Sequence, residues 1–276
     1  MIGLGQIGGE MANHLLEWPG GFTVYDVRAE AMTPFAEKGA HAAADLAEVA
    51  SRARVISIVV LNDQQVREVV DELLPAAEPG TVIAIHSTIE AQTAVDLAGT
   101  AASHGVHVVD APISGGFMGA AQGRLAVMVG GEAAAYERAE PVFRKWAALP
   151  MHLGPAGAGT RMKIARNLIT FVGYAAAHEA ERLAAAAGLD VSKLGAVVRH
   201  SDAITGGAGA VMLRSSTAPY GPEDGLRSIF EHTRELGEKD LSLAVALGDS
   251  LDIDLPLSTL ALSRLAEALG VPHEET

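Results

Sequence analysis

The first 155 residues alternate short, β-prone apolar runs with helical stretches. The runs lie at 22–26, 55–61, 81–87, 107–113 and 125–131. Strands separated by helices need crossover connections, and these give a parallel or mostly parallel sheet with helices on both faces. The first part of the chain is therefore predicted to be a doubly wound α/β domain.

Strand signals stop after "GPAGAG" at 154–159. From Thr160 to about Ala187 the sequence predicts one long helix that ends at Gly188, and further helical segments follow to Leu269. We therefore expect two domains, an α/β domain at 1–155 and an all-helical domain at 156–276 entered through the long helix. Apolar residues surround much of this helix at the start of 168–187, which favours burial against a second copy. A homodimer or a higher homo-oligomer is expected.

Composition excludes several classes of function. The 276 residues carry 34 acidic and 20 basic side chains, a formal charge of -14, without a cluster of basic and aromatic residues, so nucleic acid is not an expected partner. The apolar runs are too short and too often interrupted to span a membrane. The absence of cysteine removes disulfides and thiolate metal sites, and it fits a cytoplasmic protein.

The opening "MIGLGQIGGEM" contains a glycine pattern that is typical of dinucleotide binding. Gly3, Gly5 and Gly8 have the GxGxxG spacing, with Gln6 and Ile7 inside it. The first glycine permits a tight turn, the second lets the backbone approach a pyrophosphate, and the third lets a helix pack closely on a strand. The following helix would offer N–H groups to the phosphates. A structural turn between strand and helix is the alternative for an isolated pattern.

Asp26 ends the β-prone run at 22–26, 18 positions after Gly8. An acidic residue at this place accepts hydrogen bonds from a ribose diol, and it repels the 2′-phosphate of NADP. NAD is therefore the expected cofactor. Arg28 keeps NADP possible, because a mobile guanidinium can reach a 2′-phosphate. The alternative for Asp26 is a turn or helix-capping residue.

The histidines do not form a recognised metal pattern. His178, His200 and His232 have acidic neighbours, but none has a partner at metal-ligand spacing. No metal is expected. No GxSxG element is present, which argues against a serine hydrolase.

Three further segments, together with the opening glycines, resemble the β-hydroxyacid dehydrogenase family. They are "DAPISGGFMGAAQGRLAVMVGG" (110–131), "GPAGAGTRMKIARN" (154–167) and "EKDLSLAVALG" (238–248). The four motifs occur in the order of that family and cover nearly the whole chain. The family includes 3-hydroxyisobutyrate dehydrogenase and tartronate semialdehyde reductase, with 6-phosphogluconate dehydrogenase and the imine reductases as distant relatives. The resemblance implies a Rossmann-type NAD-binding domain followed by a helical substrate and dimerisation domain.

The resemblance implies a catalytic lysine at Lys163, within a GxGxxxKxxxN pattern that starts at Gly157. A lysine amine acts as a general acid and base if its pKa is lowered toward neutrality. Asn167 lies four positions later on the same helix face and would hold the substrate. Ser114, Gly115 and Gly116 would bind the substrate carboxylate, since their hydroxyl and exposed N–H groups suit an anion. Without the motif, the lysine and asparagine would be read as solvated surface residues.

The remaining cofactor contacts are also implied by the resemblance. They are Leu61 and Asn62 at the end of the run 55–61, Ser87 and Thr88 at the end of the run 81–87, and Lys239 and Asp240 in the helical domain. Strand-end hydroxyls also cap helices, and a Glu-Lys-Asp run is usually an exposed helix face.

The sequence departs from the family in two places. The stretch 201–209 lacks a tryptophan common there, and Arg124 replaces a small or hydroxyl residue. The expected reaction is hydride transfer between NAD and a short β-hydroxy acid or its semialdehyde, with 3-hydroxyisobutyrate as the leading substrate. Reduction of glyoxylate, tartronate semialdehyde or an imine is the alternative, and a non-catalytic dinucleotide-binding regulator is the alternative from another class.

Only Met1 and Ile2 precede the glycines, although the strand before such a loop is the central one and usually has about five residues. This predicts that the full polypeptide has several more residues upstream, apolar and β-prone.

Overall fold

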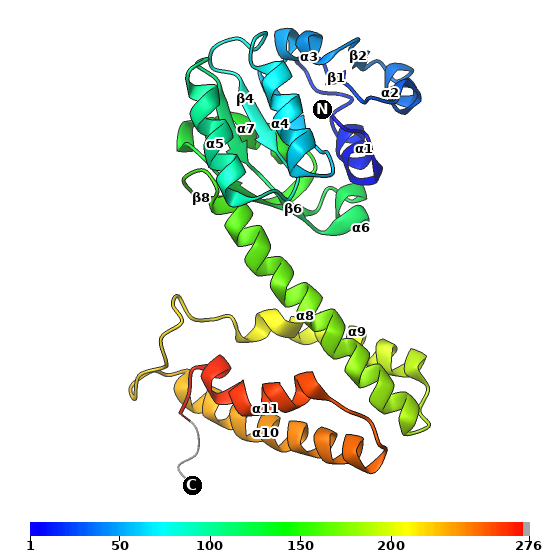
Figure 1. The fold of residues 1–276 in the computed structure, drawn as a ribbon, viewed down its shortest axis with the longest axis vertical. Helices are drawn as coiled ribbons and strands as arrows, with labels where there is room; N and C mark the ends of the chain where they lie inside the picture. The colour runs from blue at the N-terminus through cyan, green and yellow to red at the C-terminus, as the bar shows by residue number, and fades with distance from the viewer. Residues whose placement is uncertain (273–276) are drawn as a thin grey trace. The chain divides into compact units, whose positions relative to one another are not determined.

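The computed structural model describes residues 1–272. The chain forms two compact units, Met1–Asn167 and Leu168 onwards, and each is described by itself. Figure 1 shows the elements in chain order.

The first unit contains a mostly parallel sheet. Strands β3 (Val55–Ile58), β4 (Val82–Ile85) and β5 (His107–Asp110) are parallel neighbours. Strand β7 (Leu125–Gly130) is antiparallel to β5 and to β6 (Ile113–Ser114), and it is parallel to β8 (Ala147–Gly154).

A short parallel pair, β1 (Thr23–Val24) and β2 (His41–Ala42), continues this order. Ile2 joins the pair to the larger sheet, because it makes parallel bridges to Tyr25 after β1 and to Ile58 in β3. Ile2 therefore occupies the central place in the sheet, and the glycine loop begins directly after it.

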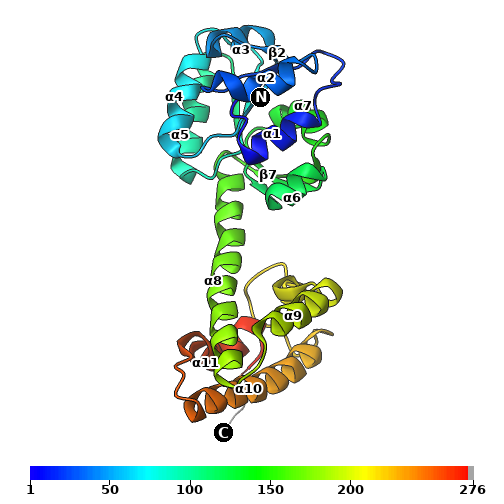
Figure 2. The ribbon, with the colours of Figure 1, turned by 90° about the vertical axis from the view of Figure 1, so that its right-hand side faces the viewer.

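Helices cover both faces of the sheet. Along β4, Val82 and Ala84 pack in one apolar cluster with α1 (Gln6–Asn13), α2 (Ala29–Ala36), α6 (Gly116–Ala121) and α7 (Ala133–Phe143). The alternate residues Ile83 and Ile85 pack in the other cluster with α3 (Leu46–Arg52), α4 (Asp63–Leu73) and α5 (Ala91–Ala102). Figure 2 shows α4 and α5 on one side of this unit and α1, α6 and α7 on the other. The doubly wound α/β fold is confirmed. Successive side chains of a strand point to opposite faces of the sheet, and helices cover both faces, so the strands are buried on both sides.

Helix α8 (Ala158–Ala186) starts in the first unit and continues into the second as 29 unbroken residues. The second unit adds α9 (Val191–Thr205), a short 3-10 helix (Gly207–Val211), α10 (Arg227–Ser250) and α11 (Pro256–Leu269). Within the described part of this unit no strand occurs, so the all-helical prediction is confirmed. The contacts divide the chain after Asn167, inside α8, rather than after 155, since the first turns of α8 pack on the sheet.

Glu179 organises the second unit. Its buried carboxylate accepts hydrogen bonds from the N–H groups of Leu257 and Ser258 at 2.8 and 3.0 Å and from the Ser258 hydroxyl at 2.9 Å. These groups lie in the first turn of α11, where a helix has unpaired N–H groups and the positive end of its dipole. The contact ties α8 to α11, so Glu179 has a structural role.

Over residues 1–272, none of the helices is long and apolar enough to cross a membrane. Over the same residues, no group of three or more His, Cys, Asp or Glu side chains is placed to hold a metal ion.

Candidate active site

The glycine loop lies between Ile2 and α1. Gly3 has φ +86°, and a Cβ there would lie 2.1 Å from the Val59 oxygen; a Cβ on Gly8 would lie 2.1 Å from the Gly3 oxygen. The fold itself therefore requires these two glycines. A Cβ on Gly5 would meet no heavy atom of the described residues within 4 Å, apart from atoms of its chain neighbours.

Gly5 is also the N-cap of α1, and among the described residues no side chain caps this helix end. Exposed Gln6 and half-buried Ile7 follow in its first turn. An uncapped helix N-terminus behind an open glycine is the environment that suits a pyrophosphate. The residues of the loop thus fit a dinucleotide.

Asp26 lies beside this loop. Its buried carboxylate accepts hydrogen bonds from the N–H groups of Leu4, at 2.8 Å, and Arg28, at 3.0 Å, and the exposed Arg28 guanidinium lies 3.2 Å away. Burial opposes ionisation, but these hydrogen bonds and the Arg28 charge outweigh it and hold the pKa of Asp26 below its usual value. Asp26 therefore stays ionised and fixes the loop.

Other predicted cofactor residues follow the neighbouring parallel strands. Ser87, after β4, donates from Oγ to the Val60 oxygen at 2.6 Å and accepts from the Val60 N–H at 3.1 Å. Leu61 is 89% exposed, and Asn62 caps α4 by accepting from the Gln65 N–H at 2.9 Å.

Thr88 is exposed beside Ser87. The structure places all four of these residues at the carboxyl edge of the sheet, where the glycine loop also lies. This is the edge at which open α/β sheets bind ligands.

The Ser-Gly-Gly segment forms the end of β6 and the start of α6. Gly115 has φ +133° and Gly116 has φ +62°, backbone conformations that side-chain-bearing residues rarely adopt. Apart from its chain neighbours and the adjacent backbone of α6, a Cβ on Gly116 would meet no heavy atom of the described residues within 4 Å, and Ser114 is half-buried. The segment therefore exposes backbone and a hydroxyl in a form that can receive an anion.

Lys163 lies in the second turn of α8, next to this segment. Its half-buried Nζ donates a hydrogen bond to the Ile113 oxygen at 2.6 Å, one residue before Ser114. Burial, aided by the charge of Arg166, lowers the pKa of Lys163. Half-buried Asn167 follows one turn later, and its Oδ1 accepts from Arg166 at 3.4 Å. The structure thus brings the predicted lysine to the predicted carboxylate-binding segment.

Sequence reasoning missed one residue of this arrangement. Asp110, at the end of β5, is buried, and its carboxylate accepts hydrogen bonds from the N–H groups of Gly157, at 2.7 Å, and Thr160, at 2.6 Å. The sequence offered one signal for this role: Asp110 is a charged residue at the end of an apolar strand, where it opens the "DAPISGG" motif, and a buried charge needs hydrogen-bond partners.

Lys239 and Asp240 lie on α10 in the second unit. Both are exposed, and their side chains pair at 3.2 Å. Their contact with the cofactor stays a prediction.

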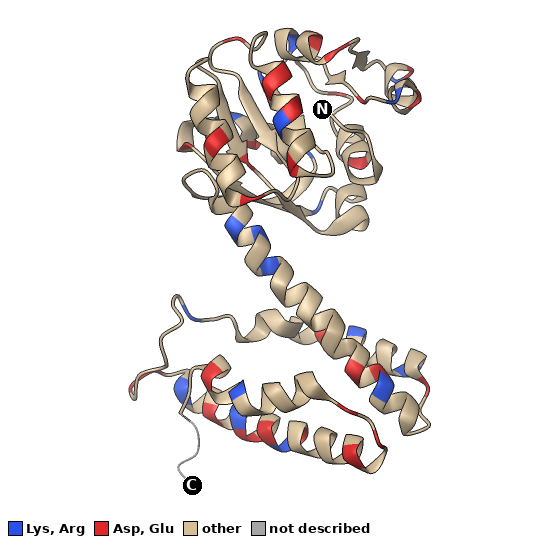
Figure 3. Ribbon diagram, in the orientation of Figure 1, with Lys and Arg blue, Asp and Glu red and all other residues tan. Residues whose placement is uncertain are grey.

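The first turns of α8 carry three basic residues in an acidic protein. Arg161, Lys163 and Arg166 are followed by a stretch free of Asp, Glu, Lys and Arg up to Glu179. Figure 3 shows blue bands at the start of this helix and an uncharged stretch after them. This local positive charge favours anionic ligands near Lys163.

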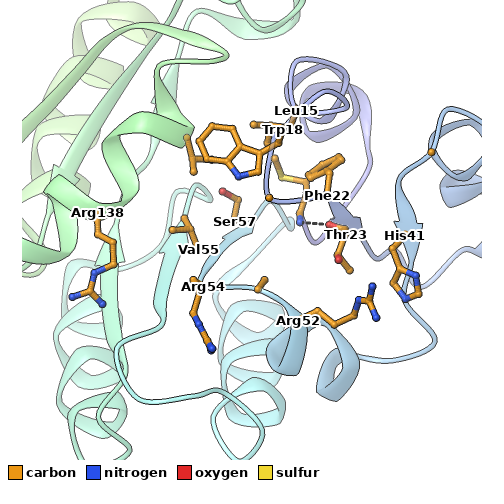
Figure 4. Close-up of a pocket in the computed structure, with 16 residues that line it drawn as sticks. Leu15, Trp18, Phe22, Thr23, His41, Arg52, Arg54, Val55, Ser57 and Arg138 are labelled. Carbon is orange, nitrogen blue, oxygen red and sulfur yellow. Dashed lines mark hydrogen bonds between the residues drawn. The ribbon is translucent and has the colours of Figure 1, made fainter.

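A cavity of about 770 Å³ opens at the opposite edge of the sheet. Figure 4 shows Thr23, Arg54 and Val55, at the starts of β1 and β3, among its lining residues, together with Trp18 and Phe22. Because the glycine loop and Lys163 lie at the carboxyl edge, this cavity is not the candidate active site.

Comparison with known families agrees with this geometry. Residues 1–164 match the family described as the NAD binding domain of 6-phosphogluconate dehydrogenase. Residues 157–274 match the family described as NAD-binding of NADP-dependent 3-hydroxyisobutyrate dehydrogenase. The chain belongs to the β-hydroxyacid dehydrogenase family. It is an NAD(P)-dependent dehydrogenase or reductase acting on a CH–OH group.

Relatives extend over almost the full chain. An uncharacterized oxidoreductase of Mycobacterium tuberculosis is 59% identical over 100% of this chain and 94% of its own length. From Pseudomonas aeruginosa, an NAD-dependent L-serine dehydrogenase is 33% identical over 95% of this chain and 89% of its own, and a 3-hydroxyisobutyrate dehydrogenase is 33% identical over 94% and 88%. A crystal structure of a Mycobacterium avium protein whose oxidoreductase activity is not established aligns with a TM-score of 0.96, at 58% identity, over 99% of this chain and 98% of that one.

Proposed function

We propose that this dehydrogenase interconverts a short β-hydroxy acid and its semialdehyde, with 3-hydroxyisobutyrate as the leading substrate. The observation that carries the proposal is the contact between Lys163 Nζ and the Ile113 oxygen at 2.6 Å, which holds an amine beside the Ser-Gly-Gly segment. A substrate carboxylate on that segment puts the hydroxyl group of a three-carbon acid within reach of the amine.

Lys163 would act as the general acid and base. Burial favours its neutral amine, which can take the hydroxyl proton during oxidation and return a proton to the carbonyl oxygen during reduction. NAD(P), when bound, accepts or supplies the hydride. The Ile113 oxygen accepts one N–H of the amine and so fixes its position.

The carboxylate would be held by the Ser114 hydroxyl and by the backbone of Gly115 and Gly116. The Asn167 amide would add a hydrogen bond to the substrate, and Arg161 and Arg166 add positive charge in the first turns of α8. Together these groups select an acid rather than a neutral alcohol.

Two relatives narrow the substrate class. L-Serine and 3-hydroxyisobutyrate, the substrates in the names of the Pseudomonas aeruginosa enzymes, are both 3-hydroxypropanoates with one small group at C2. We propose the same class of substrate for this chain, and a screen of such acids would identify the substituent at C2.

NAD is the proposed cofactor of choice. Gly3, Gly5 and Gly8 would hold the pyrophosphate and Asp26 the ribose, while Ser87 and Asn62 border the same edge. The ionised Asp26 would repel a 2′-phosphate. The exposed Arg28 side chain, 57% accessible, supports a residual use of NADP. Leu61, Thr88, Lys239 and Asp240 complete the proposed cofactor contacts.

We also propose that the chain forms a homodimer through α8. Leu168, Phe171, Val172 and Tyr174 are 52–66% exposed in a stretch without charged residues. Apolar surface on this scale is usually covered by a partner chain. Light scattering after size exclusion tests this directly. We propose that the protein is cytoplasmic, because a chain without cysteine fits a reducing compartment.

The function is tested by a spectrophotometric screen of 3-hydroxy acids, short semialdehydes, glyoxylate and a cyclic imine with each cofactor. Turnover of a 3-hydroxypropanoate with NAD at least tenfold above every other class supports the proposal. If the protein instead reduces glyoxylate, tartronate semialdehyde or the imine fastest, that compound class would replace 3-hydroxyisobutyrate as the proposed substrate. NAD binding without turnover of any compound would favour a regulator.

A further inference from the structure

Asp110 is a buried carboxylate that the proposed reaction does not use. It is 1% exposed at the end of β5, and each of its two oxygens accepts one N–H group: that of Gly157, just before α8, at 2.7 Å, and that of Thr160, in the first turn of α8, at 2.6 Å. Burial raises the pKa of the Asp110 carboxyl, and the short hydrogen bonds from the Thr160 and Gly157 N–H groups oppose this rise by favouring the carboxylate. The carboxylate thus clamps the start of α8 to the sheet.

Two glycines allow the start of α8 to approach the sheet closely. A Cβ on Gly130, in β7, would lie 2.5 Å from Asp110 Oδ1 and 2.8 Å from the nitrogens of Ala158 and Gly159. A Cβ on Gly159 would lie 2.1 Å from the Met128 oxygen. The first turn of α8 therefore rests directly on the backbone of the sheet, at a distance that no side chain permits.

The contacts of Asp110 and of Lys163 join the same two segments, the chain that leaves β5 and the start of α8. Asp110 and Ile113 are three residues apart on the segment that leaves β5, and Thr160 and Lys163 are three residues apart on α8. Asp110 meets Thr160, and Ile113 meets Lys163 at 2.6 Å. A shift or rotation of α8 that breaks the first contact also moves the amine away from the second.

We infer that Asp110 is a positioning residue for Lys163: through the first turn of α8 it fixes the amine beside the Ser-Gly-Gly segment. This rests on the proposed function for its catalytic consequence, but the positioning of the amine is measurable without turnover.

Asp110→Asn is the primary test, because it keeps the volume and replaces one accepting oxygen with a donor that faces an N–H group. Lys163 is then labelled with trinitrobenzenesulfonate across a pH series, and modification is followed by peptide mass spectrometry. Arg166, whose charge helps to lower the pKa of the Lys163 amine, is unchanged in this variant. The loosened amine gains solvent, so the inflection of labelling should move to higher pH than in the unmodified protein.

Turnover gives the second readout. With the substrate found in the screen, kcat should fall at least tenfold, while the dissociation constant of NAD changes less than threefold, and the pH inflection of oxidation should move upward with the labelling. If the unmodified protein turns over no substrate, the proposed function fails, and the labelling arm still decides the positioning role.

Asp45→Asn is the matched control. Asp45 caps α3 in the same unit by accepting from the Glu48 N–H at 2.7 Å. This variant should leave Lys163 labelling and kcat unchanged.

Asp110→Ser, which is smaller and uncharged, is the second variant, and circular dichroism with thermal unfolding checks both. An unmoved Lys163 inflection, with activity lost only in proportion to the folded fraction, would overturn the inference. Failure of both variants to fold would also contradict it, because the carboxylate would then serve the fold alone.

Discussion

The amine of Lys163 lies 2.6 Å from the main-chain oxygen of Ile113, the residue that precedes the Ser-Gly-Gly segment. This contact joins the start of α8 to the part of the sheet that can receive a carboxylate. In a 3-hydroxy acid, two carbon–carbon bonds separate the carboxylate carbon from the carbon that bears the hydroxyl group. The pair therefore defines both the anchor and the reacting end of the proposed substrate.

Gly5 and Gly8 should respond differently to the same substitution. Gly5→Ala adds a methyl group into open space, so the midpoint of thermal unfolding should change little, while NAD should bind at least tenfold more weakly. Gly8→Ala puts its Cβ 2.1 Å from the Gly3 oxygen and should destabilise the protein by about 1–3 kcal/mol. Calorimetric titration and thermal unfolding measure the two effects. Unchanged NAD affinity in Gly5→Ala would remove the loop from the cofactor site.

Asp26 should control the choice of cofactor. Asp26→Ala removes the charge that opposes a 2′-phosphate, so the ratio of kcat/KM for NAD over NADP should fall. It also leaves the Leu4 N–H without its acceptor, at a cost of about 1–3 kcal/mol. Arg28→Ala is the comparison variant, and it should reduce the use of NADP more than that of NAD. An unmodified protein that prefers NADP would refute this reading of Asp26.

His86 should make the fold sensitive to mild acid. It is 3% exposed, its Nδ1 and Nε2 lie 2.7 and 3.0 Å from the Ala111 oxygen and the Ser57 hydroxyl, and burial lowers its pKa to about 4. Between that value and about 6.5, its ordinary pKa, the unfolded chain binds the proton and the folded chain does not. The contribution of His86 to stability is therefore fully present above about pH 6.5, and it falls by up to about 3 kcal/mol as the pH drops to 4.

Urea unfolding at a series of pH values measures this slope. His86→Asn should lower stability overall but flatten the slope between pH 4 and 6.5. The same substitution at exposed His104 is the control for the chemical change. A slope that survives in His86→Asn would assign the pH dependence to other groups.

Glu179 should stabilise the second unit. Glu179→Ala removes the acceptor of two N–H groups and one hydroxyl at the start of α11, and a loss of about 2–4 kcal/mol is expected. Glu181→Ala, on the exposed side of the same helix, should change stability by less than about 0.5 kcal/mol. Denaturant unfolding compares the two. Equal effects would contradict the capping role.

The sequence predicted those parts of the fold that local patterns determine. The runs containing β3, β4 and β5 were found because their residues are buried on both faces, and α8 was found from its composition and from Gly188. Strands β2 and β6 have two residues each, and β8 contains Pro150 and several exposed positions, so none of the three has an apolar pattern.

For the site, sequence reasoning selected Lys163 and the Ser-Gly-Gly segment through the family motifs. It did not predict that Asp110 holds Gly157 and Thr160, because these residues are 47 and 50 positions away and no local pattern relates them. Burial of a charged side chain is a property of the folded chain.

Turnover by Lys163→Ala tests the central claim most directly. With NAD and the substrate found in the screen, kcat should fall about a thousandfold while NAD still binds, because a positioned general base contributes about 10²–10⁴-fold to the rate. Lys38→Ala, which removes an exposed lysine from the same unit, should keep full activity. Comparable turnover in Lys163→Ala and the unmodified protein would contradict the account.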